Sequence, residues 1–128
     1  MKSTIAILAT LFAATTFNVA AAEGDPAAGE KVFRKCKACH VVDSDQNRVG
    51  PSLQGLIGRQ PGTIDGFKYS NAMIEFGDGK VWDEELLTVY LAKPREMVKG
   101  TRMAFAGLRK DEEIADIIAY LKQYSPSE

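Results

Sequence analysis

The chain has 128 residues and a formal charge of −1, so it has the length of one domain and lacks the basic excess of a nucleic-acid-binding protein. Its apolar content of 45% and charged content of 26% are those of a globular protein and exclude a disordered chain. One histidine and two cysteines are too few for a structural zinc site, which needs four such ligands.

The first 22 residues have the pattern of a secretory signal peptide. Lys2 gives a positive start, residues 5–14 are almost wholly apolar, and residues 20–22 are the small alanines that a signal peptidase needs. An uncleaved membrane anchor is the alternative, because the stretch approaches the length of a membrane span. We expect residues 1–22 to be a cleaved signal peptide that directs the protein to the periplasm, and residues 23–128 to form one domain.

A first helix is predicted to begin at Asp25 and Pro26, because aspartate is a good N-cap and proline suits the first helical turn. Gly29, Val32 and Phe33 fall on one side of this helix, which runs toward the two cysteines. That side is expected to be buried.

Glycine and proline recur throughout residues 41–65, which predicts loops and short turns. A short helix is expected near Ser70. A clearer helix begins at Asp83 and is bounded by Pro94, since proline cannot continue a helix. Its apolar face is made by Leu86, Leu87, Tyr90 and Leu91. Residues 99–107 are expected to be irregular.

The last helix is predicted over residues 111–124. One stripe of it is apolar and comprises Ile114, Ile117, Ile118, Leu121 and Tyr124. Acidic residues crowd its start at Asp111, Glu112, Glu113 and Asp116, where the helix dipole favours negative charge. The fold class is therefore all-α, with so little regular structure that the chain struggles to bury enough apolar area by itself. A large, flat, apolar cofactor would complete such a core.

Residues 36–40 read C-K-A-C-H, and C-x-x-C-H is the attachment signal for haem c. Two thiols at this spacing can add to the two vinyl groups of one porphyrin, and the next residue then offers an imidazole nitrogen to the iron. A Cys36–Cys39 disulfide and a thioredoxin-like redox pair are the alternatives, although the second requires a βαβ context. We expect one covalent haem c, attached through Cys36 and Cys39, with His40 as an axial iron ligand.

The second axial ligand has to be sought among the methionines. His40 is the only histidine, so this chain cannot supply two imidazoles, and a thioether sulfur is the common partner. The candidates after the signal peptide are Met73, Met97 and Met103. Met103 is favoured because it lies in the irregular loop 100–107, where backbone can approach a porphyrin face, and Met97 is its rival.

Four further sequence runs accompany the C-x-x-C-H motif. They are Gly50–Leu53 (GPSL), Gly55–Arg59 (GLIGR), Gly66–Ser70 (GFKYS) and Lys99–Gly107 (KGTRMAFAG). In these runs the chain resembles class I cytochrome c, of the mitochondrial type and its soluble bacterial relatives, over nearly all of residues 23–128. The resemblance implies a fold of several short helices and Gly/Pro-rich loops wrapped around one covalent haem.

The resemblance also implies roles for individual residues. Met103 would be the second axial ligand, and the Pro51 carbonyl would accept the His40 Nδ1 hydrogen, fixing the ring and its tautomer. By the same resemblance, Arg59, Tyr69 and Trp82 would lie at the inner haem propionate. Tyr90 and Thr101 would lie on the methionine side, and Phe105 would lie beside the exposed haem edge. One departure is Met73, which stands where the mitochondrial type usually has asparagine, near the Tyr90 hydroxyl.

Each of these roles has a plainer alternative. Trp82 and Tyr90 could be core aromatics, Tyr69 a surface tyrosine, and Arg59 a solvated charge.

If two protein ligands bind the iron, no coordination position is open to a substrate. We therefore expect a soluble periplasmic electron carrier and no enzyme, since a peroxidase or a nitric-oxide-handling protein needs an open sixth site. The resemblance implies a membrane cytochrome bc complex as electron donor. It implies a terminal oxidase or a photosynthetic reaction centre as acceptor.

The distribution of charge predicts how such partners dock. Basic residues are expected around the haem edge at Lys35, Lys37, Lys93, Arg95, Lys99 and Arg102, whereas the acids cluster elsewhere. This asymmetry would steer association with acidic patches on redox partners. Scattered solvated charge is the alternative. The protein is expected to be a monomer without nucleic-acid partners.

Overall fold

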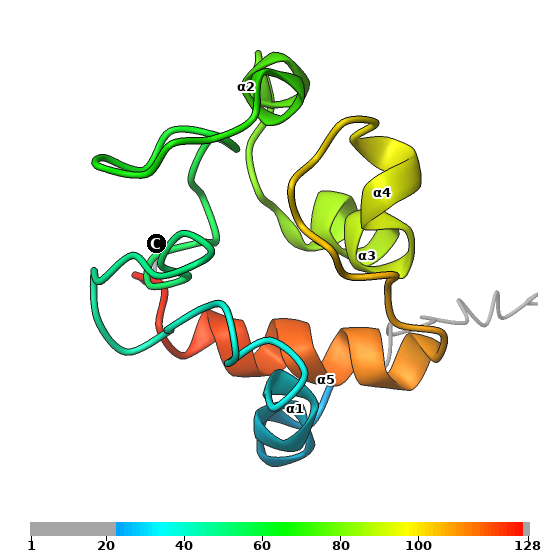
Figure 1. Cartoon of the computed structure of the whole chain (residues 1–128). Coiled ribbons are helices and arrows are strands. Elements are labelled where there is room, and N and C mark those ends of the chain that lie inside the picture. The colour runs from blue at the N-terminus through cyan, green and yellow to red at the C-terminus, as the bar shows by residue number, and fades with distance from the viewer. Residues whose placement is uncertain (1–22, 127–128) are drawn as a thin grey trace, which may run out of the picture.

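The structure is a computed structural model and describes residues 23–126. Within them the elements are five helices and no strands: α1 (Pro26–Phe33), α2 (Asn71–Gly77), α3 (Glu84–Ala92), α4 (Pro94–Met97) and α5 (Asp111–Lys122). The predicted all-α class is therefore confirmed (Figure 1). The predicted signal peptide lies outside the described residues. Of the helices in residues 23–126, none combines the length and the apolar character needed to cross a membrane.

Helix α1 begins as its sequence predicts. The Asp25 carboxylate caps it by accepting a hydrogen bond of 2.8 Å from the Ala27 amide. Gly29, Val32 and Phe33 are its buried residues. A Cβ on Gly29 would lie 2.0 Å from the Asp116 carbonyl oxygen, so only glycine allows α1 to approach the backbone of α5 this closely. Figure 1 shows these two helices crossing.

Helices α2 and α3 also begin where expected, each capped by a side chain that accepts from the helix backbone. Ser70 accepts from the Met73 amide at 3.1 Å, and Asp83 accepts from the Leu86 amide at 2.7 Å. Pro94 was predicted only to bound the second of these helices. It also opens α4, because a proline that cannot continue one helix suits the first turn of the next.

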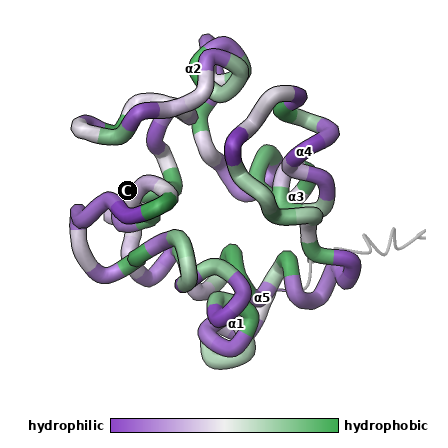
Figure 2. The backbone as a smooth tube through the Cα atoms, in the orientation of Figure 1, coloured by the Kyte–Doolittle hydropathy of each residue, from purple (hydrophilic) through white to green (hydrophobic). Residues whose placement is uncertain are grey.

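Helix α5 contributes five of the fourteen buried hydrophobic residues of the core, more than any other helix. Four residues of its predicted apolar stripe are buried: Ile114, Ile117, Ile118 and Leu121. The helix ends at Lys122, and Tyr124, the fifth, follows in a turn and is half-buried. Asp116, expected among the acids at the helix start, is instead buried and faces the beginning of α1. Figure 2 shows hydrophobic and hydrophilic residues alternating along the helices. Each helix therefore presents one apolar side to the interior.

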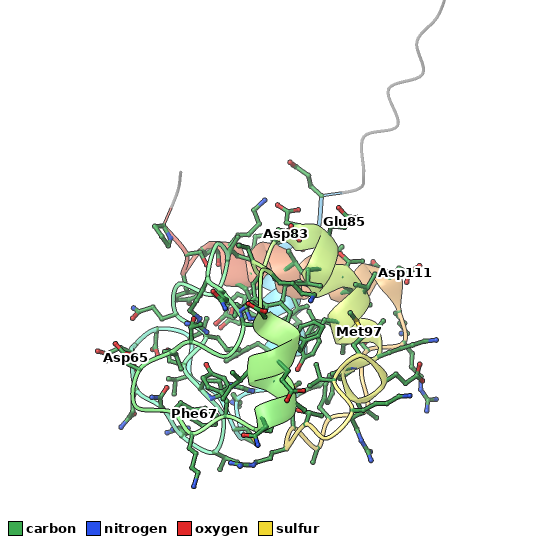
Figure 3. All side chains as sticks on the ribbon, turned by 90° about the horizontal axis from the view of Figure 1, so that it is seen from above. Asp65, Phe67, Asp83, Glu85, Met97 and Asp111 are labelled. Atoms are coloured by element: carbon green, nitrogen blue, oxygen red, sulfur yellow. The ribbon has the colours of Figure 1, made fainter. Side chains whose placement is uncertain are left out.

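Charged side chains cover the outside of this arrangement. Figure 3 shows Asp83 and Glu85 at one edge of the molecule and Phe67 near the opposite one. Long loops, residues 41–69 and 98–110, join the helices and bring two sequence-distant segments to face each other. These loops form most of the site described next.

Candidate cofactor site

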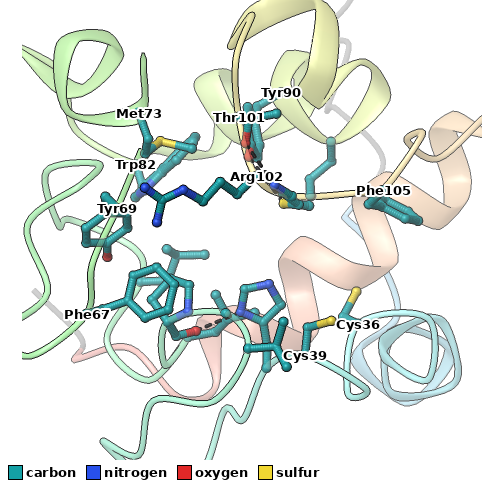
Figure 4. Close-up of a pocket in the computed structure, with 18 of the residues that line it drawn as sticks. Cys36, Cys39, Phe67, Tyr69, Met73, Trp82, Tyr90, Thr101, Arg102 and Phe105 are labelled. Carbon is teal, nitrogen blue, oxygen red and sulfur yellow. Dashed lines mark hydrogen bonds between the residues drawn. The ribbon is translucent and has the colours of Figure 1, made fainter. Parts of the chain in front are cut away.

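A cavity of about 520 Å³ lies between the two long loops. With the exception of the rival ligand Met97, the residues predicted to bind or surround the haem all line it: Cys36, Cys39, His40, Pro51, Arg59, Tyr69, Trp82, Tyr90, Thr101, Met103 and Phe105. Figure 4 shows Cys36 and Cys39 on one side and Tyr90, Thr101 and Arg102 on the other. The cavity therefore has two faces with different chemistry.

The first face is built by the turns that follow α1. The Cys36 amide donates to the Phe33 carbonyl at 2.8 Å, and the amides of Cys39 and His40 both donate to the Cys36 carbonyl at 3.0 Å. The chain thus coils through the whole motif, and Cys36, Cys39 and His40 line the cavity. Both thiols are free. Burial raises the pKa of the Cys36 thiol to about 11, so that thiol is neutral near pH 7.

The orientation of His40 is fixed from two directions. Its Nδ1 lies 2.7 Å from the Pro51 carbonyl oxygen, and since a carbonyl can only accept, Nδ1 carries the hydrogen. Burial lowers the pKa of the imidazole, so the ring is neutral and Nε2 keeps a free lone pair. Gly50 lies against the ring, and a Cβ there would be 2.3 Å from Cε1.

The opposite face is the loop that contains Met103. The Tyr90 hydroxyl donates to Met103 Sδ at 3.4 Å, and the Met103 amide donates to Thr101 Oγ1 at 3.2 Å. Burial raises the pKa of Tyr90 to about 12. Met97, the rival ligand, packs against the hydrophobic core and is not among the residues that line the cavity. Met73 does line it, near Trp82 in Figure 4.

Polar groups gather away from the cysteines. The Arg59 guanidinium donates to the Ser52 carbonyl at 2.9 Å and to the Gln54 carbonyl at 3.1 Å. Burial lowers its pKa, and burial raises the pKa of Tyr69, whose hydroxyl accepts from the Ile64 amide at 3.3 Å. Arg59 is therefore tied to its own loop and is no freely solvated charge.

Trp82 and Phe105 complete the aromatic part of the lining. Trp82 is only 6% exposed, and its ring centroid lies 4.7 Å from that of Tyr90. It is thus a packed core aromatic that also lines the cavity, and its role at a haem propionate stays a prediction. Phe105 is half-buried on the same side of the cavity as the methionine loop.

Two supporting residues were not predicted. Asn47 accepts from the Ser52 amide at 2.9 Å and donates to the Asp65 carbonyl at 3.0 Å, joining two loops behind the His40 side. Ser52 is fully buried and donates to the Ser44 carbonyl. Nothing in the local pattern distinguishes Asn47 from a surface loop residue, and its Asp65 partner lies 18 residues away in the sequence. Ser52 belongs to the GPSL run, which was the only signal for it.

The six predicted docking residues are all exposed, but they differ in their contacts. Lys35 pairs with Glu113 at 3.0 Å, and Lys93 pairs with Glu96 at 3.7 Å. Arg102 donates to the Lys68 carbonyl at 3.1 Å. The remaining three, Lys37, Arg95 and Lys99, make no ion pair with the described residues.

This donor set fits a covalently attached haem. Two free thiols and a neutral imidazole come from one wall, and a thioether comes from the other, around an interior lined largely by apolar and aromatic side chains. The sequence model of the cytochrome c family matches residues 26–125. The chain belongs to the cytochrome c family. Members of this family hold haem c covalently with its iron, and they are electron carriers rather than enzymes.

Individual relatives agree with this assignment. The chain is 43% identical over 106 residues to cytochrome c2 of Blastochloris viridis, covering 82% of each chain. It is 47% identical over 102 residues to cytochrome c-550 of Ancylobacter novellus, covering 78% of this chain and 95% of the relative. The solved structure of cytochrome c2 from Rhodospirillum centenum matches with a TM-score of 0.74 at 45% identity, over 80% of this chain and all of that one.

A second solved structure, cytochrome cH from Methylobacterium extorquens, matches with a TM-score of 0.72 and 44% identity. The match covers 78% of this chain and 99% of that one. The predicted class I cytochrome c fold is confirmed by these neighbours together with the helical architecture.

Proposed function

We propose that this cytochrome c carries single electrons with His40 and Met103 as the two axial ligands of its iron. The haem supplies the metal that changes oxidation state by one electron. The observation that carries the proposal is the placement of a neutral imidazole and a hydrogen-bonded thioether on opposite walls of one cavity.

The chain's own residues would keep the site closed to chemistry other than electron transfer. With His40 and Met103 both coordinated, no position would be open for dioxygen, peroxide or a substrate. Cys36 and Cys39 would hold the group by two thioether bonds. The apolar walls would limit the response of solvent to a change in charge and favour the less charged reduced state.

The polar residues of the cavity would donate hydrogen bonds to the propionate groups of the haem. Arg59, Tyr69 and Trp82 line one region of the cavity, and their guanidinium, hydroxyl and indole groups can all donate hydrogen bonds. Thr101 would hold the methionine loop through the Met103 amide. Phe105 would lie at the exposed edge, where an electron enters and leaves.

We further propose that the protein acts in the periplasm after removal of residues 1–22, as a soluble monomer. A membrane cytochrome bc complex would be the donor, and a terminal oxidase or a photosynthetic reaction centre the acceptor. The resemblance to bacterial cytochromes c2 and c-550 supports this setting. The exposure of the six basic residues at positions 35, 37, 93, 95, 99 and 102 supports docking on acidic partner surfaces.

The axial ligands are tested by the near-infrared sulfur-to-iron band of the oxidised protein, produced in a host with haem-attachment machinery. Met103→Ala should abolish the band and allow added imidazole to bind. Met97→Ala is the matched control, because Met97 is also partly buried but does not line the cavity. An unchanged band in Met103→Ala, or its loss only in Met97→Ala, would disprove the assignment.

Covalent attachment is tested separately by haem staining after denaturing electrophoresis. Wild-type protein should stain, and the double variant Cys36→Ala/Cys39→Ala should not. A stained double variant would show that the motif is not the attachment point.

A further inference from the structure

Helix α2 packs an apolar face beside Tyr90. Met73 and Phe76 are three residues apart on this helix, so their side chains leave it on the same side. Met73 lines the cavity, and Figure 4 shows its side chain beside Trp82. The Phe76 ring centroid lies 6.1 Å from that of Tyr90 and 5.9 Å from that of Trp82. Both α2 residues are partly buried and pack against the hydrophobic core.

The backbone of Met73 is held in place at both ends of this short helix. Its amide donates to the Ser70 hydroxyl oxygen at 3.1 Å, and Ser70 is itself buried. At the other end, a Cβ on Gly77 would lie 2.0 Å from the Pro61 carbonyl oxygen, so the helix ends tightly against that loop. The Met73 side chain therefore leaves a fixed point of the cavity wall.

The Tyr90 hydroxyl has one hydrogen-bond acceptor among residues 23–126, the Met103 sulfur. Thr101 Oγ1, on the same wall, accepts from the Met103 amide. Figure 4 shows the Arg102 side chain in this part of the cavity, but a guanidinium has no acceptor atom and cannot take the hydroxyl hydrogen. Burial raises the pKa of Tyr90, as expected of a hydroxyl in apolar surroundings.

The side chain at position 73 determines whether Met103 remains the sole acceptor. A thioether is a weak acceptor and donates nothing, whereas the amide of an asparagine or glutamine has a strong acceptor oxygen and two donor hydrogens. An amide on this wall would compete with Met103 for the hydroxyl hydrogen. It would also favour water in a region that is otherwise apolar.

We infer that Met73 is a positioning residue for the Tyr90 hydroxyl: its apolar side chain leaves Met103 as the only acceptor and so keeps the hydroxyl hydrogen on the sulfur. This rests on the proposed function, in which Met103 binds the iron. Met73 acts on the iron ligand through Tyr90, so its effect is a coupling between two residues. Removal of the hydroxyl changes the reduction potential by the full amount only while position 73 is apolar.

A double-mutant cycle of reduction potentials measures this coupling in the haem-loaded protein. The shift caused by Tyr90→Phe is determined in the wild type, in Met73→Gln and in Met73→Leu. In Met73→Gln the amide oxygen competes for the hydroxyl hydrogen, so the shift should fall to less than about half of its wild-type size. Met73→Leu is the matched control, because leucine has nearly the volume of methionine and no polar group, and it should keep the wild-type shift.

A second amide variant and two further measurements complete the experiment. Met73→Asn repeats the test with the amide closer to the helix backbone. The near-infrared sulfur-to-iron band, recorded for every variant, shows whether the compared proteins have the same ligands. Denaturant unfolding measures stability, since a residue needed only for packing would lower stability when replaced and leave the Tyr90→Phe shift unchanged.

The outcomes separate this inference from the ligand assignment. If the wild type shows the band and Tyr90→Phe causes the wild-type shift in both amide variants, the inference is overturned and the ligand assignment stands. The same holds if Met73→Leu reduces the shift as much as the amides do, or if Tyr90→Phe leaves the wild-type potential unchanged. If the wild type lacks the band, the ligand assignment fails, and the inference fails with it.

Discussion

The Tyr90 hydroxyl donates its hydrogen to Met103 Sδ across 3.4 Å, and within residues 23–126 the hydroxyl has no other hydrogen-bond partner. Tyr90 is 5% exposed, with the Trp82 and Phe76 rings packed beside it. Met73, at the position where a resemblance to the mitochondrial type suggested asparagine, adds a thioether to the same cavity. The hydroxyl therefore directs its only hydrogen at the proposed iron ligand.

Tyr90→Phe should lower the reduction potential. A hydrogen bond to sulfur withdraws electron density from it, which favours the reduced iron, and the substitution removes that effect. A net hydrogen bond of about 0.5–1.5 kcal/mol corresponds to about 20–60 mV for one electron. A redox titration followed in the visible spectrum measures the shift. A potential equal to or above that of the wild type would contradict the role given to the hydroxyl.

The same hydroxyl makes stability depend on alkaline pH. Burial raises the pKa of Tyr90 from 10.0 to about 12 in the folded protein. Between these values the unfolded chain loses the proton and the folded chain keeps it, so the folded state binds more protons and the free energy of unfolding falls as pH rises. The loss should reach about 2–3 kcal/mol by pH 12.

Denaturant unfolding at several pH values from 8 upward measures this loss, and Tyr90→Phe is its control. Other groups titrate equally in both proteins, so the difference between wild type and variant isolates Tyr90. Parallel stability curves for the two proteins would show that the hydroxyl does not couple to folding.

The sequence predicted the helices whose starts carry side-chain caps. Asp25, Ser70 and Asp83 each mark a helix correctly, because an N-cap acts on amides only two or three residues away. α4 was missed, because Pro94 ends one helix and begins another and the pattern alone does not distinguish these roles. Such local features can be recognised in a sequence without knowledge of the tertiary structure.

The cofactor site likewise has parts that the sequence predicts and parts that it does not. The motif at 36–40 predicts its chemistry from spacing alone, and Met103 could be favoured over Met97 by its loop. The Arg102 bond to Lys68 and the loop bridge made by Asn47 could not be predicted, since each joins residues that only tertiary folding brings together. Asp116 was misjudged for the same reason, because its acceptor role depends on how α1 crosses α5.

Electron transfer with an acidic redox protein should slow as ionic strength rises, because salt screens the attraction of exposed charges. Lys37→Gln should reduce the bimolecular rate constant about two- to threefold at low ionic strength. Lys80→Gln is the control, since it removes the same charge from a residue that follows α2 and lies over the Phe76 ring. Stopped-flow kinetics over a range of salt measures both, and a rate independent of salt would contradict steering.

Gly50→Ala should disturb the haem site. Its Cβ would lie 2.3 Å from His40 Cε1 and 2.7 Å from Nδ1, so the ring would have to move away from the Pro51 carbonyl. We expect a shifted visible spectrum and potential, together with a stability loss of about 1–3 kcal/mol.

Gly29→Ala provides the comparison for that variant. Its Cβ would meet the Asp116 carbonyl oxygen at 2.0 Å, so it should destabilise the α1–α5 crossing by a similar amount. It touches no residue of the haem site, and its spectrum should match that of the wild type. If both glycine variants had the visible spectrum of the wild type, Gly50 would be needed for packing alone.

Asp116 should contribute to stability and not to the redox site. It is 8% exposed, and its Oδ1 accepts from the Asp25 amide at 2.7 Å, which ties the start of α1 to the middle of α5. Asp116→Ala leaves that amide without its acceptor and should cost about 1–3 kcal/mol in denaturant unfolding, whereas Asp116→Asn keeps an acceptor oxygen and should cost less. Asp111→Ala, at an exposed residue of the same helix, should cost under about 1 kcal/mol. If Asp116→Ala were no more destabilising than Asp111→Ala, the interhelical bond would not contribute to folding. A changed reduction potential in Asp116→Ala would place Asp116 in the redox site instead.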